Sequence, residues 1–251
     1  CYNPLTVTSV TITEENSRYY YTGAWTPAFE DVTSIKEYTA TRAPNTYTIT
    51  FADGIGTGGS SDVYEAYESA AQLAADAPTI TPPTGYNNNG WPNFYTVAVD
   101  KTYTAKFTIK AFAIDFDENG GGTATRIPST GYTNYGTGIS LPSITKTATA
   151  QYTYAVAGWW SSETSNQGSG TQRTWTTMPD LGTTNTQTTL YAKWTETLRS
   201  YTISYYGGGG TPSLSTASLN YGVHANAADP TVTRTGYHHT GWTPALTTVT
   251  G

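Results

Sequence analysis

Residues 89–107, NGWPNFYTVAVDKTYTAKF, decide the fold because their pattern recurs along the chain. It returns as GAWTPAFEDVTSIKEYTATR at 23–42 and TGWTPALTTVTG at 240–251, and a looser copy runs from Gly158 to LYAKW at 190–194. The shared skeleton is a glycine turn, a tryptophan and a short link, followed in the longer copies by an alternating strand with Tyr-x-Ala-x-aromatic character. A phrase that recurs in order is typical of a repeat protein.

A second phrase precedes the tryptophans and runs into glycines. It reads YTITFADGIGTGG at 47–59, FAIDFDENGGGT at 112–123 and YTISYYGGGGT at 201–211, and a Gly-Tyr pair follows in PPTGY at 82–86 and TRTGY at 233–237. Alternation lets one face of each strand pack inward while threonine covers the other. The phrase therefore predicts β-strands that end in tight glycine turns.

The two phrases together predict tandem modules. The tryptophans Trp25, Trp91, Trp159 and Trp242 are spaced by 66, 68 and 83 residues. We expect an N-terminal strand and partial module at 1–43, full modules at 44–109 and 110–196, the latter with an insert at 161–189, and a third module at 197–251 that lacks its closing strand.

One stretch, SDVYEAYESAAQLAADA at 61–77, has helical periodicity. Asp62 with Glu65 three residues later matches a capping box, and Pro78 would end the helix. The predicted fold class is mainly β, with small modules of mixed or antiparallel sheets and one short helix in the first full module.

The ordered phrases resemble the internalin-type B-repeat family of bacterial cell surfaces. The third copy carries YTISYYGGGG, NYGVHANAADPTVTRTGY and TGW in the order of that family, and the second carries FDENGGG and LYAKW. The resemblance covers residues 44–251, apart from the insert at 161–189 and a first module in which the predicted helix replaces the Tyr-Gly link. It implies small β-grasp-like modules in a surface stalk or adhesin, without catalytic residues.

Composition and charge narrow the classes of partner. The chain has 251 residues, 21 Tyr and 25 Gly, a net charge of -6 and only 12 Lys and Arg. A nucleic-acid partner is not expected, because phosphate contacts need clustered cations. No apolar run is long enough to cross a bilayer. Few charges, many threonines and a single cysteine favour an extracellular or cell-surface protein of a prokaryote.

The first residue, Cys1, suggests a membrane anchor. In bacterial lipoproteins the cysteine after the cleaved signal peptide carries lipid, and acyl chains would hold the protein at a membrane. A cropped start, or a thiol that bridges two chains, would also place a cysteine here. Lipid on Cys1 is the one membrane contact that the sequence predicts.

The segment DFDENGGG at 115–122 resembles the start of a calcium loop through Asp115, Asp117 and Asn119. The place of the bidentate glutamate of an EF-hand holds Arg126, so these residues are weak calcium candidates. A tight Asn-Gly hairpin explains them without metal. We therefore predict no metal and no other cofactor.

Motifs of catalysis are missing from the sequence. The chain has no Gly-x-Ser-x-Gly elbow, no His-Glu-x-x-His and no Gly-x-x-x-x-Gly-Lys, and its histidines are His224, His238 and His239. Carboxylates from different modules could form a glycosidase pair only on a larger rigid scaffold. We expect that the protein is not an enzyme.

The aromatic residues have two interpretations. Trp25, Trp91, Trp159 and Trp242, with Tyr38, Tyr103 and Tyr191 of the closing strands, are expected to anchor the module cores. Trp160 and Trp175 are extra to the repeat, so an aromatic patch that binds cell-surface glycans would lie there.

A closing strand is absent after Trp242, although Tyr38 and Tyr103 mark one after Trp25 and Trp91. We expect an unpaired strand edge in the third module. The alternating segment LTVTSVTIT at 5–13, or a strand like it, could fill that edge in the next subunit and give a head-to-tail homopolymer. The alternative is that neighbouring modules of a longer repeat chain fill it.

The sequence thus predicts a structural subunit of an extracellular filament or cell-surface stalk. The alternative is a cell-surface adhesin or glycan-binding module.

Overall fold

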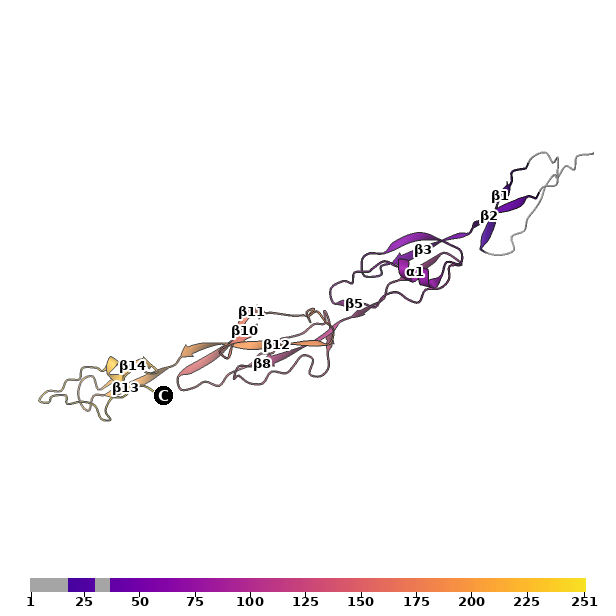
Figure 1. Ribbon diagram of the computed structural model, residues 1–251. Helices are drawn as coiled ribbons and strands as arrows, with labels where there is room; N and C mark the ends of the chain where they lie inside the picture. Colours follow the sequence, from indigo (N-terminus) through magenta and orange to yellow (C-terminus); the bar gives the residue numbers. More distant parts are fainter. Residues whose placement is uncertain (1–17, 30–36) are drawn as a thin grey trace, which may run out of the picture. The chain divides into compact units, whose positions relative to one another are not determined.

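A computed structural model of the chain describes residues 18–29 and 37–251 (Figure 1). The chain divides into two compact units, Cys1–Lys110 and Ala111–Gly251, and we describe each by itself. The described residues are mainly β, in antiparallel and mixed sheets, with one α-helix. The predicted mainly β fold class is confirmed. No helix in the described ranges is both long and apolar enough to cross a membrane.

The first unit begins with a two-stranded antiparallel sheet of β1 (Tyr19–Thr26) and β2 (Thr39–Pro44). Trp25 of β1 is paired with Ala40 of β2, and the register shifts between Tyr21 and Trp25. This sheet corresponds to the tryptophan strand and the closing strand of a module.

A complete module follows in the first unit. Its sheet has the order β4-β3-β6, in which β4 (Ser60–Glu65) is antiparallel and β6 (Lys101–Thr104) is parallel to the central β3 (Thr46–Ala52). A second small sheet pairs β5 (Tyr86–Asn88) with β7 (Phe107–Ile109). The closing strand of this module is therefore parallel to its first strand.

The helix predicted over 61–77 forms only in its second half, as α1 (Ala70–Asp76). Asp62 lies instead in β4, and Ser69 is the N-cap, whose hydroxyl accepts the N–H of Gln72 at 3.1 Å. Pairing with β3 overrides the helical pattern because residues 60–65 complete a hairpin. The predicted capping box is wrong.

The second unit begins with a five-stranded sheet of order β11-β10-β12-β8-β9. Its strands are β8 (Ala111–Asp117), β9 (Thr133–Asn134), β10 (Tyr152–Thr164), β11 (Gln167–Arg173) and β12 (Thr186–Leu198). The closing strand β12 is again parallel to the first strand, β8, and antiparallel to the tryptophan strand, β10. Phe116 lies opposite Leu190 as Phe51 lies opposite Tyr103 in the first unit.

The predicted insert at 161–189 is not a single addition. Its first part, to Arg173, extends β10 and forms a hairpin with β11. Its last residues belong to the closing strand, and Met178 between them enters the core of the module. Only the hairpin is extra to the repeat.

The rest of the second unit is the third module. β13 (Ser200–Tyr206) and β14 (Leu214–Asn220) form a two-stranded antiparallel sheet, and the 3-10 helix η1 (Ala225–Ala228) follows. Within the described residues β13 has no partner strand besides β14. No described strand takes the place beside β13 that β6 takes beside β3 and β12 takes beside β8.

A two-residue link between the glycine turn and the tryptophan makes the same backbone hydrogen bonds in all three modules. An apolar residue that follows the tryptophan accepts the N–H of the first link residue and donates its own N–H to the carbonyl of the second. The sets are Val97 with Tyr67 and Glu68, Met178 with Gly136 and Thr137, and Val249 with Gly222 and Val223. The first link residue always has a positive φ, 68°, 76° and 83° in chain order. The Tyr-Gly link of the first module is thus retained, with Tyr67 in place of glycine.

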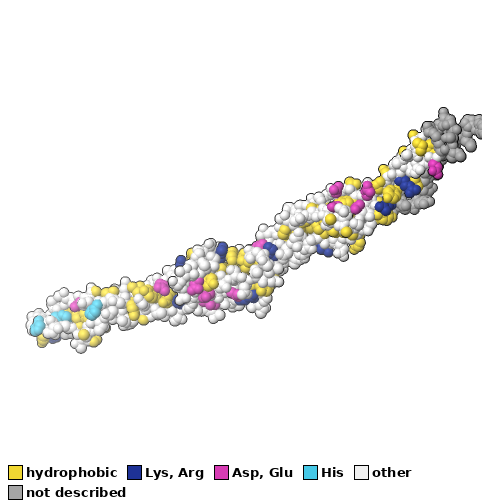
Figure 2. Space-filling model, viewed as in Figure 1, with side chains coloured by type: hydrophobic (Ala, Val, Ile, Leu, Met, Phe, Trp, Pro, Cys, Tyr) yellow, Lys and Arg dark blue, Asp and Glu magenta, His cyan; other side chains and the backbone are white. Residues whose placement is uncertain are grey.

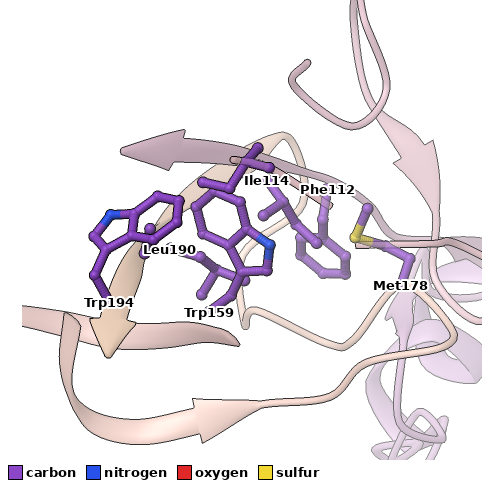
Figure 3. Packing of buried hydrophobic residues seen from close by; sticks show 8 residues of the cluster. Phe112, Ile114, Trp159, Met178, Leu190 and Trp194 are labelled. Atoms are coloured by element: carbon purple, nitrogen blue, oxygen red, sulfur yellow. The ribbon is translucent and has the colours of Figure 1, made fainter. Parts of the chain in front are cut away.

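The cores lie between the first strand, the tryptophan and the closing strand. Figure 3 shows the core of the second module, where side chains from separate segments meet: Phe112, Ile114, Trp159, Met178, Leu190 and Trp194. The first unit has the same arrangement on a smaller scale, with Ile49, Phe51, Leu73, Val97 and Tyr103.

The core of the third module is less closed. Between residues 200 and 251 the buried apolar residues are Tyr205, Ala225 and Val249. Ile203 is only half-buried, whereas the matching Ile49 and Ile114 are 1% and 0% exposed. Ile203 is thus more exposed at the place where a closing strand covers the first strand in the other two modules.

Candidate functional site

The predicted tryptophan anchors occupy one structural position in three modules. Each ring contacts the aromatic residue of the first strand, with centroids 5.4 Å apart for Trp91 and Phe51, 4.6 Å for Trp159 and Phe116, and 5.3 Å for Trp242 and Tyr205. Each indole N–H donates to the segment before the tryptophan: to Pro78 O, Pro142 O and Asp229 Oδ1. These contacts give the tryptophans a structural role.

Trp25 and Tyr38 lie in the partial module of the first unit. Phe29 stands between them, with its ring centroid 5.3 Å from that of Trp25 and 5.0 Å from that of Tyr38. The hydroxyl of Tyr38 is buried without a hydrogen-bond partner in the described part of the chain. Both residues thus pack locally, and the sheet β1-β2 has no first strand beside it among the described residues.

In the closing strands, a large residue is followed two positions later by a small one. Tyr103 and Ala105 are 3% and 7% exposed in the first unit, and Leu190 and Ala192 are 1% and 0% exposed in the second. Leu190 therefore holds the place that the sequence assigns to Tyr191, and Tyr191 is half-buried on the opposite face of β12. Within LYAKW, the residues that face the core are therefore Leu190, Ala192 and Trp194.

Two positions after the small residue, Ala105 or Ala192, an aromatic ring lies over a glycine turn. A Cβ at Gly56 would stand 2.8 Å from the ring of Phe107, and a Cβ at Gly121 would overlap the ring of Trp194. Trp194 also donates its indole N–H to Glu118 O at 2.9 Å. Only glycine allows this close approach, so the turn and the closing aromatic residue form one unit.

The third module has the turn without the ring. Gly210 N–H donates to Gly207 O at 2.8 Å, as Gly121 N–H donates to Glu118 O at 3.0 Å. The atoms that a Cβ at Gly210 would meet belong to Val232, Thr233 and Gly207, and none of them is aromatic. Among the described residues the third module therefore has the glycine turn but no aromatic ring of a closing strand over it.

The first unit shows which backbone groups of β13 a closing strand would pair with. There Thr48 N–H donates to Asp100 Oδ1 at 2.7 Å and Ala52 O accepts from Ala105 N–H at 3.0 Å, so alternate residues of β3 face β6. The matching residues of β13 are Thr202, Ser204 and Tyr206. We call this row the open edge; an unpaired row of N–H and C=O groups is a template for another strand.

The predicted calcium residues do not converge. Asp115 forms an ion pair with Arg126 at 3.0 Å, and Asp117 Oδ1 accepts the backbone N–H of Asn119 at 3.0 Å. The Asn119 side chain is buried and donates to Ala192 O at 2.7 Å. The described residues contain no group of three or more His, Cys, Asp and Glu side chains suited to hold a metal ion. Asn119 instead ties the turn to the closing strand.

The two residues of the predicted aromatic patch each have contacts of their own. Lys193 Nζ lies 4.4 Å from the centroid of Trp160, and a Cβ at Gly168 would be 3.0 Å from the Trp160 side chain. Trp175 packs against the core of the second module and has Arg173 over its ring at 5.3 Å. Both rings are half-buried and have a cation nearby, and the glycan-binding patch stays a prediction.

The histidines gather in the third module. His224 is the N-cap of η1, and His239 contacts Trp242 with ring centroids 5.1 Å apart. His238 and His239 line a shallow depression together with Arg234 and Tyr237. On the face shown in Figure 2 charged side chains are few, scattered and of both signs.

Comparison with protein-family models, curated proteins and solved structures gives no match. The resemblance to the internalin-type B-repeat family stays a prediction. Cys1, with its predicted lipid, and the segment 5–13 lie outside the described residues.

Proposed function

We propose that the chain is a structural subunit of an extracellular filament or cell-surface stalk, in which subunits join by strand addition at the open edge. The observation that carries this proposal is the difference between β13 and the other first strands. β3 and β8 each have a parallel closing strand, whereas β13 pairs with β14 alone in the part of the chain that the structure describes. A partner strand would satisfy the backbone groups and cover Ile203.

The energy of such a contact favours assembly. A backbone hydrogen bond contributes about 0.5–1.5 kcal/mol net, and burial of one large apolar side chain about 1.5–3 kcal/mol. A strand as long as β6, with one buried large residue, can thus hold two subunits together when ordering costs are small.

The junctions between modules also suit a load-bearing protein. Asn45 donates its N–H to Arg18 O and accepts from Ala66 N–H, and Arg199 does the same with Gln151 and Tyr221. A single linker residue is thus bonded to the modules before and after it. Hydrogen bonds on both sides of a linker residue would limit bending between the two modules that it joins.

A non-enzymatic role at a prokaryotic cell surface is part of the proposal. Three acids take structural roles: Asp115 pairs with Arg126, Asp117 caps a turn and Asp100 caps β3. The low proportion of charged residues, 12%, and the many threonines support an exposed extracellular location.

The test is electron microscopy of the purified full chain. We expect regular filaments from the wild type, and loss of filaments from Ser204→Pro, which removes an N–H on the open edge but none of the hydrogen bonds to β14. Ser204→Ala is the matched control and should polymerise normally. Amide hydrogen exchange in β14 checks that the third module remains folded. A wild-type chain that stays monomeric at high concentration contradicts the proposal.

A further inference from the structure

The two closing strands define which strand the open edge can accept. β6 runs parallel to β3 and reads Thr102-Tyr103-Thr104-Ala105, with the large residue opposite Phe51 and the small one two places later. In β12 a large residue opposite Phe116 is again followed by Ala192. The strand must therefore run parallel to β13 and present a large and then a small side chain to the core.

The chain contains a second segment with this order outside the described modules. Residues 5–13, LTVTSVTIT, include Thr6-Val7-Thr8-Ser9, which matches Thr102-Tyr103-Thr104-Ala105 as threonine, large, threonine, small. The segment has nine residues and is longer than β6. Thr6 and Thr8 would face outward, as Thr102 and Thr104 of β6 do.

We propose that residues 5–13 of a second copy of the chain fill the open edge as a strand parallel to β13. This inference rests on the proposed function and names its partner strand and register. Val7 lies opposite Tyr205 and packs on Ile203, and the Ser9 N–H donates to Tyr206 O, as Ala105 N–H donates to Ala52 O.

The register places Thr8 beside Tyr206 on the outer face, because Thr104 is paired with Ala52 in the first unit. Tyr206 is 71% exposed, so this pair is accessible to a cross-linking reaction. A second pair, Thr6 beside Ser204, follows from the same register. Both pairs can be replaced by cysteine without disturbing the core.

Cysteine cross-linking of the full chain tests the register. In a Cys1→Ser background, Thr8→Cys and Tyr206→Cys are placed in separate chains, mixed and oxidised with oxidised glutathione. We expect a disulfide-linked dimer from the mixture and at least about tenfold less from either variant alone, because cysteines out of register lie too far apart. Thr6→Cys with Ser204→Cys should link equally well, whereas Thr6→Cys with Tyr206→Cys should not.

The outcomes separate this inference from the proposed function. Filaments that form without the Thr8–Tyr206 link overturn the inference and leave the proposed function standing. Absence of both filaments and link overturns both. A chain that carries both Thr8→Cys and Tyr206→Cys and links within itself, unaffected by dilution, also overturns the inference, because the segment then acts in its own chain. Residues 10–13, VTIT, would be the part that acts in its own chain: they resemble the first-strand phrase YTIT at 47–50 and would allow pairing with β2 of the same chain.

A peptide competition keeps the test independent of any variant. A synthetic peptide of residues 5–13 added to the wild-type chain should occupy the open edge and shorten the filaments. A scrambled peptide of the same composition is the control. Filaments of unchanged length at saturating peptide contradict the proposal.

Discussion

The second and third modules share one hydrogen-bond plan but differ in closure. Each has the glycine turn, the link that pairs with a later apolar residue, and a tryptophan on the aromatic residue of the first strand. In the second module the closing strand buries Trp159 to 3% exposure, whereas Trp242 is only half-buried. The turn and the link therefore form without a closing strand, and the closing strand completes the core.

The two modules also differ in what receives the indole N–H. Trp159 donates to the backbone carbonyl of Pro142, and Trp242 donates to the exposed carboxylate of Asp229 at 2.6 Å. A charged acceptor is compatible with a ring that still contacts water, because a buried carboxylate without a cation would be costly. The hydrogen bond from Trp242 thus fits the lower burial of its ring in the third module.

The largest expected effect concerns the anchor of the closing strand. Leu190→Ala removes a side chain that is 1% exposed, so it should lower the stability of the second module by about 2–5 kcal/mol. Tyr191→Ala, on the other face of β12, should cost about 1 kcal/mol or less. Hydrogen exchange of the β8 and β12 amides in the full chain measures both. Equal losses would mean that the closing strand has no preferred inner face.

A smaller effect is expected at the shared link. Gly136 and Gly222 have φ of 76° and 83°, and a Cβ at either position would meet nothing within 4 Å. Alanine at each should cost about 1 kcal/mol from backbone conformation alone. In the first module Tyr67 has a φ of 68°, and Tyr67→Gly should recover a similar amount. Amide exchange in the three modules measures these changes, and opposite signs for Tyr67→Gly and Gly136→Ala are required.

The sequence was sufficient for the first strands β3, β8 and β13, for the closing strands β6 and β12 and for the tryptophan positions, because these depend on local alternation and on one large residue for each core. It failed at 61–77, where pairing with β3 wins over a helical pattern. It also missed the link in the first module, because Tyr67 carries no glycine signal for its left-handed backbone. The contact between the closing aromatic ring and the glycine turn was not predicted, because it joins residues that are far apart in the sequence. The recurrent glycines were the sequence signal for it.

The smallest expected effect distinguishes the first module from the third by pH. Burial, and then the negative charges of Asp76 and Asp62, raise the pKa of Tyr64 in β4. Its neutral form is therefore favoured in the folded chain, and the stability linked to it is present below the ordinary pKa of tyrosine, about 10, and is lost as pH rises above that value. Leu219 holds the matching place in β14, opposite Tyr201 as Tyr64 is opposite Tyr47. Tyr64→Phe should thus reduce the alkaline loss of protection in β3 and leave β13 unchanged, as measured by amide exchange on either side of pH 10. If β3 loses protection equally in the wild type and the variant, the environment of Tyr64 does not penalise its ionisation.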